Sequence, residues 1–347
     1  MDNPKPRKIT AERLAEAAKK SVTISTSASL VRAGYLDSRS CLPLVIEPAL
    51  KNIDLISWAG SNRDRVESDL SRHGAILFRG FRVSGACEFE ALIRTLYGEP
   101  LQYQERSSPR SQVSGRIYTS TDYPSDQSIF LHNENSYQKT WPMRILFFCE
   151  TPPDEGGETP IADCRRIFDR LDPMVRNDFI ARRWMYVRNF NDGFGLPWQT
   201  VFQTEDRGVA EEHCRRNQIT CEWKENGRLR TRAIRRAAQD HPLTGEPVWF
   251  NHAAFFHVST LETGIRDSLL ALFNEEDLPS NTYYGDGVPI EGSTAELLRN
   301  AYRRESVYFS WKRSDILLLD NMLVAHGRAP YKGSRAVLVG MARPFEP

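Results

Sequence analysis

The chain has 347 residues, of which 26% are charged and 40% hydrophobic, and its formal net charge is +1. This is a globular composition, and a charge balance near zero argues against a nucleic-acid-binding protein, which usually carries a basic stripe. The scattered cysteines, the absence of a signal peptide and the absence of any apolar run near the roughly 20 residues of a membrane span predict a cytoplasmic protein with no membrane contact.

Residues 1–60 are predicted to form an N-terminal extension, in which an amphipathic helix near 11–20 is followed by irregular structure. A helical pattern then begins at Ser61 and ends at Gly74, a residue type that often terminates helices. The strand-like AILFRGF follows directly. SGACEFEALIRTLYGEP predicts a further helix that closes at Gly98.

Short stretches rich in β-branched and aromatic residues dominate the rest of the chain, which is typical of strands. These stretches are RILFFCE, RWMYVRNF, ITCEW, RLRTRAI, PVWFNHA, VYFSW, DILLLDN and SRAVLVGMA. Helical patterns lie between them in CRRIFDRLDPMVRNDFIARR, DRGVAEEHCRRN, TGIRDSLLALFNEE and STAELLRNAYRRE. Many strands with interspersed helices predict a mainly β fold with helices (α+β), a β-sandwich or jelly roll. No long linker divides the chain, so we expect one domain over residues 1–347.

One residue separates His132 from Glu134 in FLHNENSYQKTWP. In an extended segment, residues i and i+2 point to the same face, so the imidazole and the carboxylate can bind one metal ion or can form a polar stripe that faces water. An iron site of the two-histidine, one-carboxylate type needs a second histidine and leaves coordination positions open. His326 is the candidate, because it follows the buried-strand pattern DILLLDN and precedes a strand that carries Arg335.

Arg335 and Thr159 suit a dicarboxylate co-substrate. If a keto acid chelates iron through one end, its distal carboxylate remains in the pocket, where a guanidinium can hold it bidentately. Thr159, in EGGETPIAD, can add a hydroxyl hydrogen bond, and Gly156 and Gly157 allow close backbone approach. Taken alone, Arg335 would more often be a surface salt-bridge partner, and Thr159 can simply close a turn.

Three stretches together, LHNENSYQKTWP, PPDEGGETPIAD and LLLDNMLVAHGRAPYKGSRAVLV, resemble the iron(II)/2-oxoglutarate-dependent dioxygenases of the TauD/TfdA family. Within that family the chain looks similar to the syringomycin-biosynthesis hydroxylase branch. The resemblance implies a distorted double-stranded β-helix with helical packing. It also implies Fe(II) on His132, Glu134 and His326, with 2-oxoglutarate on Thr159 and Arg335 and O2 as the oxidant.

Two departures from the taurine enzyme bear on the substrate. The resemblance places Glu134 where that enzyme has aspartate, and the longer acid can still bind iron. Halogenases of the family replace this acid with a small residue, so hydroxylation is expected here. The sulfonate-binding arginine of the taurine enzyme lies four residues beyond its oxoglutarate arginine, and Val339 occupies that position. A simple sulfonate substrate is therefore not expected.

The branch resemblance implies hydroxylation of an unactivated C–H bond, at the β-carbon of an amino acid, in secondary-metabolite biosynthesis. The substrate is expected to be free or tethered to the carrier protein of a nonribosomal peptide synthetase. A related dioxygenase that performs desaturation, cyclisation or catabolic oxidation of a small acid is the alternative. A metal-binding partner protein without catalysis is the hypothesis from another class.

Candidate substrate contacts lie before the metal strand, around the ligands and in an insertion at about 184–247 that is predicted to form a lid. They are Tyr118, Thr121, Tyr123, Asn133, Asn135, Asn189 and Arg230. Arg230 alternates with Arg228 and Arg232, so the three can meet a carboxylate or phosphate or form a solvated face. His252 and His257 are predicted to line the core or the substrate rather than to bind metal, because a five-residue spacing does not share a strand face.

Overall fold

The computed structural model describes residues 30–37, 40–102, 111–120, 123–190 and 195–347. The helix predicted near 11–20 and the candidate substrate residue Thr121 lie outside these residues.

The largest sheet has eight strands in the order β1-β2-β3-β16-β7-β19-β5-β4, antiparallel except between β2 and β3. Their bounds are β1 (Val31–Asp37), β2 (Ser40–Pro48), β3 (Ala75–Phe78), β16 (Ile316–Asp320), β7 (Trp141–Thr151), β19 (Ala336–Phe345), β5 (Ile117–Thr119) and β4 (Gln112–Ser114). The prediction of irregular structure before residue 50 is wrong for β1 and β2. Two prolines obscure the strand signal of β2, which is stabilised by pairing with β3, distant in sequence.

The central strands of this sheet are covered on both faces. Along β16, Leu317 and Leu319 enter one core, whereas Ile316 and Leu318 enter another. The second of these cores lies beneath helices α2 (Leu55–Ser61), α3 (Arg63–His73) and α4 (Ala86–Tyr97). Because neither face meets water, β3 and β16 appear in the sequence as the continuous apolar runs AILF and ILLL.

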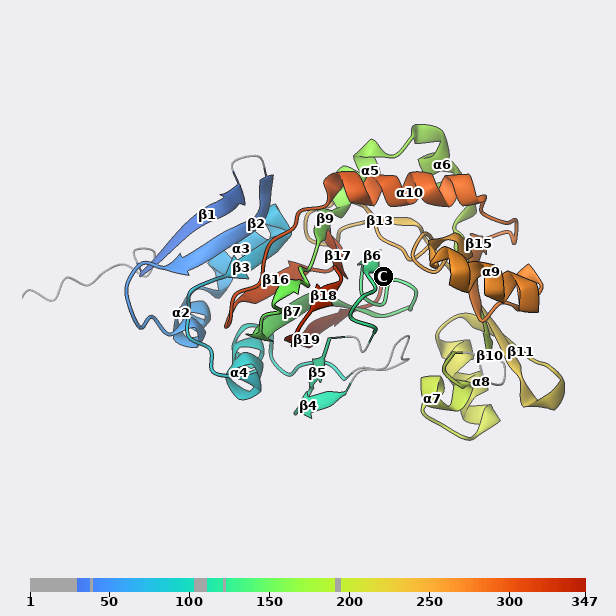
Figure 1. Cartoon of the computed structure of the whole chain (residues 1–347), viewed down its shortest axis with the longest axis horizontal. Helices are drawn as coiled ribbons and strands as arrows, with labels where there is room; N and C mark the ends of the chain where they lie inside the picture. Colours follow the sequence, from blue (N-terminus) through green and yellow to red (C-terminus); the bar gives the residue numbers. More distant parts are fainter. Residues whose placement is uncertain (1–29, 38–39, 103–110, 121–122, 191–194) are drawn as a thin grey trace, which may run out of the picture.

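A second, smaller sheet packs on the core that Leu317 and Leu319 enter, which we call the inner core, and it completes the predicted jelly roll. Its strands run in the order β6-β17-β9, with bounds β6 (Ile129–His132), β17 (Val324–Arg328) and β9 (Ile161–Asp163). A short pair, β8 (Glu155–Gly156) with β18 (Tyr331–Lys332), extends from it. Figure 1 shows β6, β9 and β17 in front of β7, β16 and β19, so the two sheets form a double-stranded β-helix.

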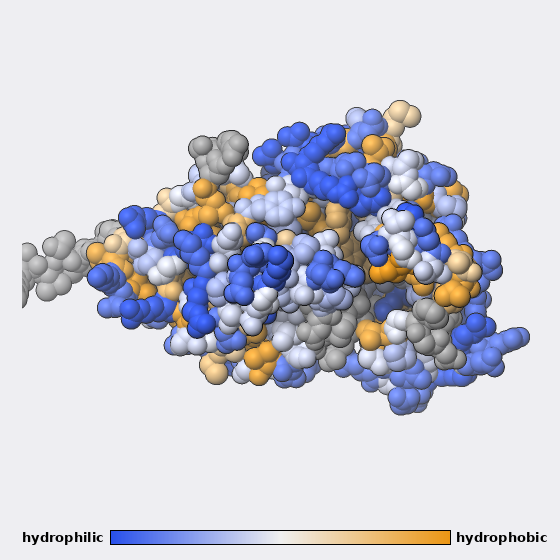
Figure 2. Space-filling model, in the orientation of Figure 1, coloured by the Kyte–Doolittle hydropathy of each residue, from blue (hydrophilic) through white to orange (hydrophobic). Residues whose placement is uncertain are grey.

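Three helices, α5 (Cys164–Arg170), α6 (Pro173–Arg182) and α10 (Gly292–Glu305), lie along one side of the smaller sheet (Figure 1). The sequence predicts one helix across the first two. Asp172 instead caps α6, accepting a hydrogen bond from the Met174 amide at 2.8 Å, and Pro173 begins the new helix. Figure 2 shows hydrophilic residues gathered over α5 and α10, where exposed arginines pair with glutamates of the same face.

The predicted lid region forms a separate four-stranded sheet in the order β11-β12-β10-β15. Its elements are β10 (Trp184–Phe190), α7 (Trp198–Phe202), α8 (Arg207–Arg216), β11 (Ile219–Trp223), η2 (Glu225–Gly227), β12 (Leu229–Arg235) and β15 (Ser280–Tyr284). Since β15 lies beyond residue 247, the unit extends past the predicted insertion. Its function as a lid remains a prediction.

The remaining elements connect this sheet to the jelly roll. They are β13 (Ala238–Asp240), β14 (Pro247–Trp249), η3 (Val258–Thr260), α9 (Thr263–Leu272) and η4 (Glu275–Asp277). The predicted strand VYFSW is not a strand; within it, Val307 alone forms a bridge, to Ile161. No helix among the described residues is long and apolar enough to cross a membrane.

Candidate metal centre

The register of two neighbouring strands brings the predicted metal ligands together. β6 and β17 pair antiparallel with His132 opposite His326, and the centroids of the two rings lie 4.6 Å apart. Glu134 follows β6, and its Oε2 lies 3.9 Å from His326 Nε2. One potential ligand atom from each of the three residues lies within 4.8 Å of the others. Two imidazoles and one carboxylate are the donor set of non-haem iron(II) oxygenases.

The hydrogen bonding of His132 fits a metal-binding role. Its Nδ1 lies 2.9 Å from the backbone oxygen of Phe130, an acceptor, so Nδ1 carries the proton and Nε2 keeps its lone pair. Metal-binding histidines commonly donate their other nitrogen to a backbone carbonyl in this way. Glu134 and His326 are buried, which favours neutralisation of the carboxylate by a cation. The residues present therefore fit Fe(II).

The turn after β16 holds the backbone of the glutamate ligand. Asn321 accepts a hydrogen bond from the Glu134 amide at 2.8 Å and donates to the Glu134 carbonyl and to the Pro142 carbonyl, both at 2.8 Å. Asn133 donates in turn to the Asn321 carbonyl at 2.7 Å. The DN turn is visible in the sequence, but this contact across 187 residues is not.

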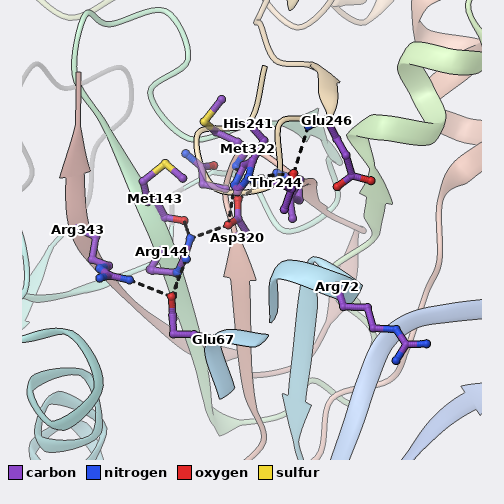
Figure 3. A network of polar contacts seen from close by, with 12 residues as sticks. Glu67, Arg72, Met143, Arg144, His241, Thr244, Glu246, Asp320, Met322 and Arg343 are labelled. Atoms are coloured by element: carbon purple, nitrogen blue, oxygen red, sulfur yellow. Dashed lines mark hydrogen bonds and ion pairs between the residues drawn. The ribbon is translucent and has the colours of Figure 1, made fainter. Parts of the chain in front are cut away.

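A buried ionic network supports the same turn (Figure 3). Asp320 accepts from Arg144 at 2.6 Å and from His241 at 3.1 Å, and it also caps two backbone amides of the turn. Arg144 continues to Glu67 at 2.9 Å. Burial raises the pKa of Asp320, but the His241 hydrogen bond and the Arg144 charge outweigh it and hold that pKa below its usual value.

A small cavity of about 30 Å³ adjoins the metal ligands, and we call it the inner cavity. Its lining residues are Ser120, Ile129, His132, Phe147, Thr159, His326, Gly327, Arg328 and Arg335. Arg335 is oriented by hydrogen bonds to the Gly157 carbonyl at 3.0 Å and to Ser120 Oγ at 3.2 Å. The Thr159 hydroxyl accepts from Trp311 Nε1 at 3.1 Å. The cavity thus joins two metal ligands with a guanidinium and a hydroxyl.

Arg335 is a half-buried cation with no carboxylate partner among the described residues. Burial and the neighbouring charge of Arg328 lower its pKa to about 10, so it remains protonated at neutral pH. Gly157 allows this placement: its φ is +68°, and a Cβ there would lie 3.1 Å from Arg335 Cδ and 2.7 Å from Pro153 Cγ. A bound carboxylate would balance the charge of Arg335.

The candidate substrate residues near the ligands have different surroundings. Tyr118 is buried in the inner core, and Tyr123 is 41% exposed. Asn133 is buried with its amide directed to Asn321 and Cys164. Asn135 has a φ of +57° in the turn after the ligands.

Asn189 and Arg230 bind each other instead of lining the inner cavity. Arg230 Nε donates to Asn189 Oδ1 at 2.7 Å, and Arg230 also donates to Asp277 at 2.6 Å. The other Asn189 contacts are the carbonyls of Glu276 and Leu278. Both side chains join β10 and β12 to η4, so the structure assigns their polar groups to internal contacts; a substrate contact for them remains a prediction.

The sequence did not identify Arg328 as a site residue, and it did not predict that His252 packs against a metal ligand. Arg328, two residues after His326, donates to the carbonyls of Tyr123 and Gln127 at 2.9 and 2.8 Å. His252 packs against His132 with ring centroids 5.5 Å apart, and its Nδ1 lies 2.6 Å from Ser136 Oγ. The two-residue spacing from His326 to Arg328 could have indicated Arg328 in the sequence. The position of His252 beside His132 depends on tertiary packing.

Comparison with known proteins agrees with this geometry. The sequence pattern of the taurine catabolism dioxygenase TauD, TfdA family matches residues 39–342. The chain is 40% identical to the dapdiamide synthesis protein DdaC of Enterobacter agglomerans, over 81% of this chain and 86% of the relative. It is 29% identical to a clavaminate synthase-like protein of Arabidopsis thaliana, over 80% and 84% of the two chains.

Solved structures show the same fold at low sequence identity. PvcB from Pseudomonas aeruginosa superimposes with a TM-score of 0.55 at 16% identity, covering 92% of this chain and 93% of the other. A taurine dioxygenase from Burkholderia xenovorans superimposes with a TM-score of 0.51 at 14% identity, covering 92% of each chain. The predicted double-stranded β-helix is confirmed by these matches.

Proposed function

This chain belongs to the TauD/TfdA family of iron(II)- and 2-oxoglutarate-dependent oxygenases, and from this membership we propose that it hydroxylates an unactivated C–H bond of an amino-acid-like substrate in secondary-metabolite biosynthesis. The observation that carries the proposal is the convergence of His132, Glu134 and His326 beside a half-buried arginine. The predicted cytoplasmic location is part of the proposal.

Each site residue has a distinct part in the reaction. His132, Glu134 and His326 would hold iron(II), which, with 2-oxoglutarate and oxygen, supplies the oxidising chemistry as 2-oxoglutarate is converted to succinate and CO2. Arg335 and Thr159 orient the co-substrate through its distal carboxylate. Phe147 and Ile129 line the inner cavity with apolar surface and limit the access of water.

The relatives support a biosynthetic role. One is described as a dapdiamide synthesis protein, and PvcB is described as an oxygenase from an isonitrile synthetic pathway. The finer assignment to the syringomycin branch, with hydroxylation at a β-carbon and tethering to a carrier protein, belongs to this proposal. Val339, buried and apolar where the taurine enzyme has its sulfonate-binding arginine, is consistent with a substrate other than a sulfonate.

The test is product analysis by mass spectrometry. Purified protein would be incubated with Fe(II), 2-oxoglutarate, oxygen and a panel of L-amino acids, both free and loaded on a carrier protein. We expect one substrate to gain one oxygen atom with stoichiometric succinate. A loss of two hydrogens would identify desaturation or cyclisation instead.

His326→Ala provides the matched control for this assay. It should abolish succinate formation while circular dichroism shows an unchanged fold, because it removes one metal ligand and leaves the hydrogen bonds of Asp320 and Asn321 in place. A wild-type protein that bound no 2-oxoglutarate would refute both enzymatic hypotheses and favour a non-catalytic metal-binding protein.

A further inference from the structure

A second cavity, which we call the outer cavity, lies next to the inner one and has a volume of about 370 Å³. Thr119, Ser120, Tyr123, Arg328, Tyr331 and Arg335 line it, together with the first residues of β19 after Arg335. This volume falls in the range of about 300–1,000 Å³ typical of small-molecule sites.

The two cavities share a wall, but the metal ligands line only one of them. Ser120, Arg328 and Arg335 border both, whereas the metal-binding histidines and Thr159 border the inner cavity alone. A co-substrate that extends from the metal ligands to Arg335 therefore ends at this shared wall. The outer cavity remains available to another molecule.

The charge of the outer cavity indicates an anionic ligand. Arg328 and Arg335 lie on the same aromatic ring, that of Tyr331, at 5.3 and 5.6 Å from its centroid. No carboxylate is among the residues that line this cavity in the described part of the chain. Two cations around one ring repel each other, and a single co-substrate carboxylate at Arg335 still leaves a net positive charge at this wall.

The available hydrogen-bond donors are consistent with carboxylate binding. Arg335 uses Nε and one N–H of Nη1 for contacts within the protein, which leaves one N–H of Nη1 and two of Nη2 for the co-substrate and a second ligand. Arg328 commits its terminal nitrogens to backbone carbonyls, and its buried Nε has no partner among the described residues. Hydroxyls of Thr119, Tyr123 and Tyr331 complete the polar lining.

We propose that the outer cavity binds a second small dicarboxylate, of the class to which 2-oxoglutarate and succinate belong. The inference rests on the proposed function, which brings both compounds to the protein, and it adds a site that does not use the metal. A dicarboxylate bound there would contact Arg335 from the cavity that the metal ligands do not line.

Equilibrium dialysis of the full-length, Mn(II)-loaded protein against radiolabelled 2-oxoglutarate tests the proposal. We expect two molecules per chain at saturation, one bound tightly and one weakly. Succinate lacks the keto acid that chelates metal, so it should displace the weakly bound molecule first. Acetate, with a single carboxylate, should displace it at least tenfold less effectively.

A matched pair of variants at Thr119 distinguishes the effect of an added negative charge on ligand binding from the effect of a longer side chain. Thr119→Glu and Thr119→Gln have the same length, and both lose the hydrogen bond that Thr119 accepts from the Ser111 amide at 3.0 Å. The glutamate variant should bind the second molecule at least tenfold more weakly than the glutamine variant. The tight site should be equal in both.

The outcomes distinguish this inference from the proposed function. One molecule per chain at every concentration, equal second-site affinity in the two Thr119 variants, or equal displacement by acetate and succinate would overturn the outer dicarboxylate site while leaving the oxygenase intact. Absence of any 2-oxoglutarate binding would overturn the proposed function instead.

Discussion

A single hydrogen bond determines how His132 meets a metal ion. The Phe130 carbonyl accepts from Nδ1, so the ring can offer only Nε2 as a ligand. Arg335 is constrained in the same manner, because the Gly157 carbonyl and the Ser120 hydroxyl set the direction of its guanidinium. Both residues are therefore oriented before any ligand binds, which lowers the entropic cost of binding.

Replacement of Arg335 by lysine should weaken 2-oxoglutarate binding about ten- to hundredfold, which corresponds to about 1.5–3 kcal/mol. Lysine keeps the charge but cannot hold a carboxylate bidentately while it bonds the Gly157 carbonyl. Isothermal titration of the Mn(II)-loaded protein measures the change. Arg343→Lys, at an exposed position of the same strand, is the control and should bind as the wild type does. Equal affinity in both variants would remove Arg335 from the co-substrate site.

At the scale of elements, the turn between β16 and β17 connects both halves of the metal centre. β17 carries His326, and Asn321 in the turn holds the Glu134 backbone. The turn is itself held by Asp320, which joins β7 through Arg144 (Figure 3). The same turn therefore positions the metal ligands and stabilises the fold.

Asn321→Ala should lower Mn(II) affinity about 10- to 100-fold, the usual effect of removing a group that orients a metal ligand. It should also destabilise the chain by about 1–3 kcal/mol, because backbone groups of Glu134 and Pro142 lose their partner. Electron paramagnetic resonance of free Mn(II) measures the affinity. Asn281→Ala, which removes a buried asparagine bonded to the Val258 amide, should cost similar stability without loss of metal affinity. Similar metal affinities in the two variants would contradict the assignment.

Asp320→Asn should reduce stability in a pH-dependent manner. The folded-state pKa of Asp320 lies below its usual value of 3.8, so protons bind the unfolded chain more tightly. The stabilisation is therefore present at neutral pH and is lost as the pH falls through the folded pKa. At pH 7 the variant should be about 3–5 kcal/mol less stable, since Arg144 loses a buried charge partner. Urea unfolding at pH 7 and at pH 3 measures both values, and an equal difference at the two would count against the charge network.

At the scale of the whole molecule, the metal centre lies between the two sheets of the jelly roll. Its histidines come from the smaller sheet, while the turn that positions Glu134 belongs to the strand β16 of the larger sheet. A metal ion bound here connects the halves of the barrel, so its binding should stabilise the fold as a unit.

Mn(II) at one hundred times its dissociation constant should raise the free energy of unfolding by about 2.7 kcal/mol. The thermal midpoint should rise by several degrees and return on addition of EDTA. Differential scanning calorimetry measures the shift. His326→Ala should show no shift at the same concentration, and a wild-type midpoint insensitive to the metal would argue against a resident ion.

The sequence by itself determined the strands that are buried on both faces, β3, β7 and β16, because burial leaves a continuous apolar run whatever the partner. The HxE motif is also visible in the sequence, but Glu134 lies in the turn after β6, so strand alternation does not set its direction. Only the tertiary structure decided that β1 and β2 join the main sheet, that VYFSW contributes one bridge, and that Arg230 bonds Asn189. Only the tertiary structure, too, placed Asn321 behind Glu134 and set Arg328 and Arg335 around one tyrosine ring. The hydrophobic pattern of a sequence indicates which side chains are buried. A polar contact between residues far apart in the chain depends on how the strands pair and on which turns this pairing brings together.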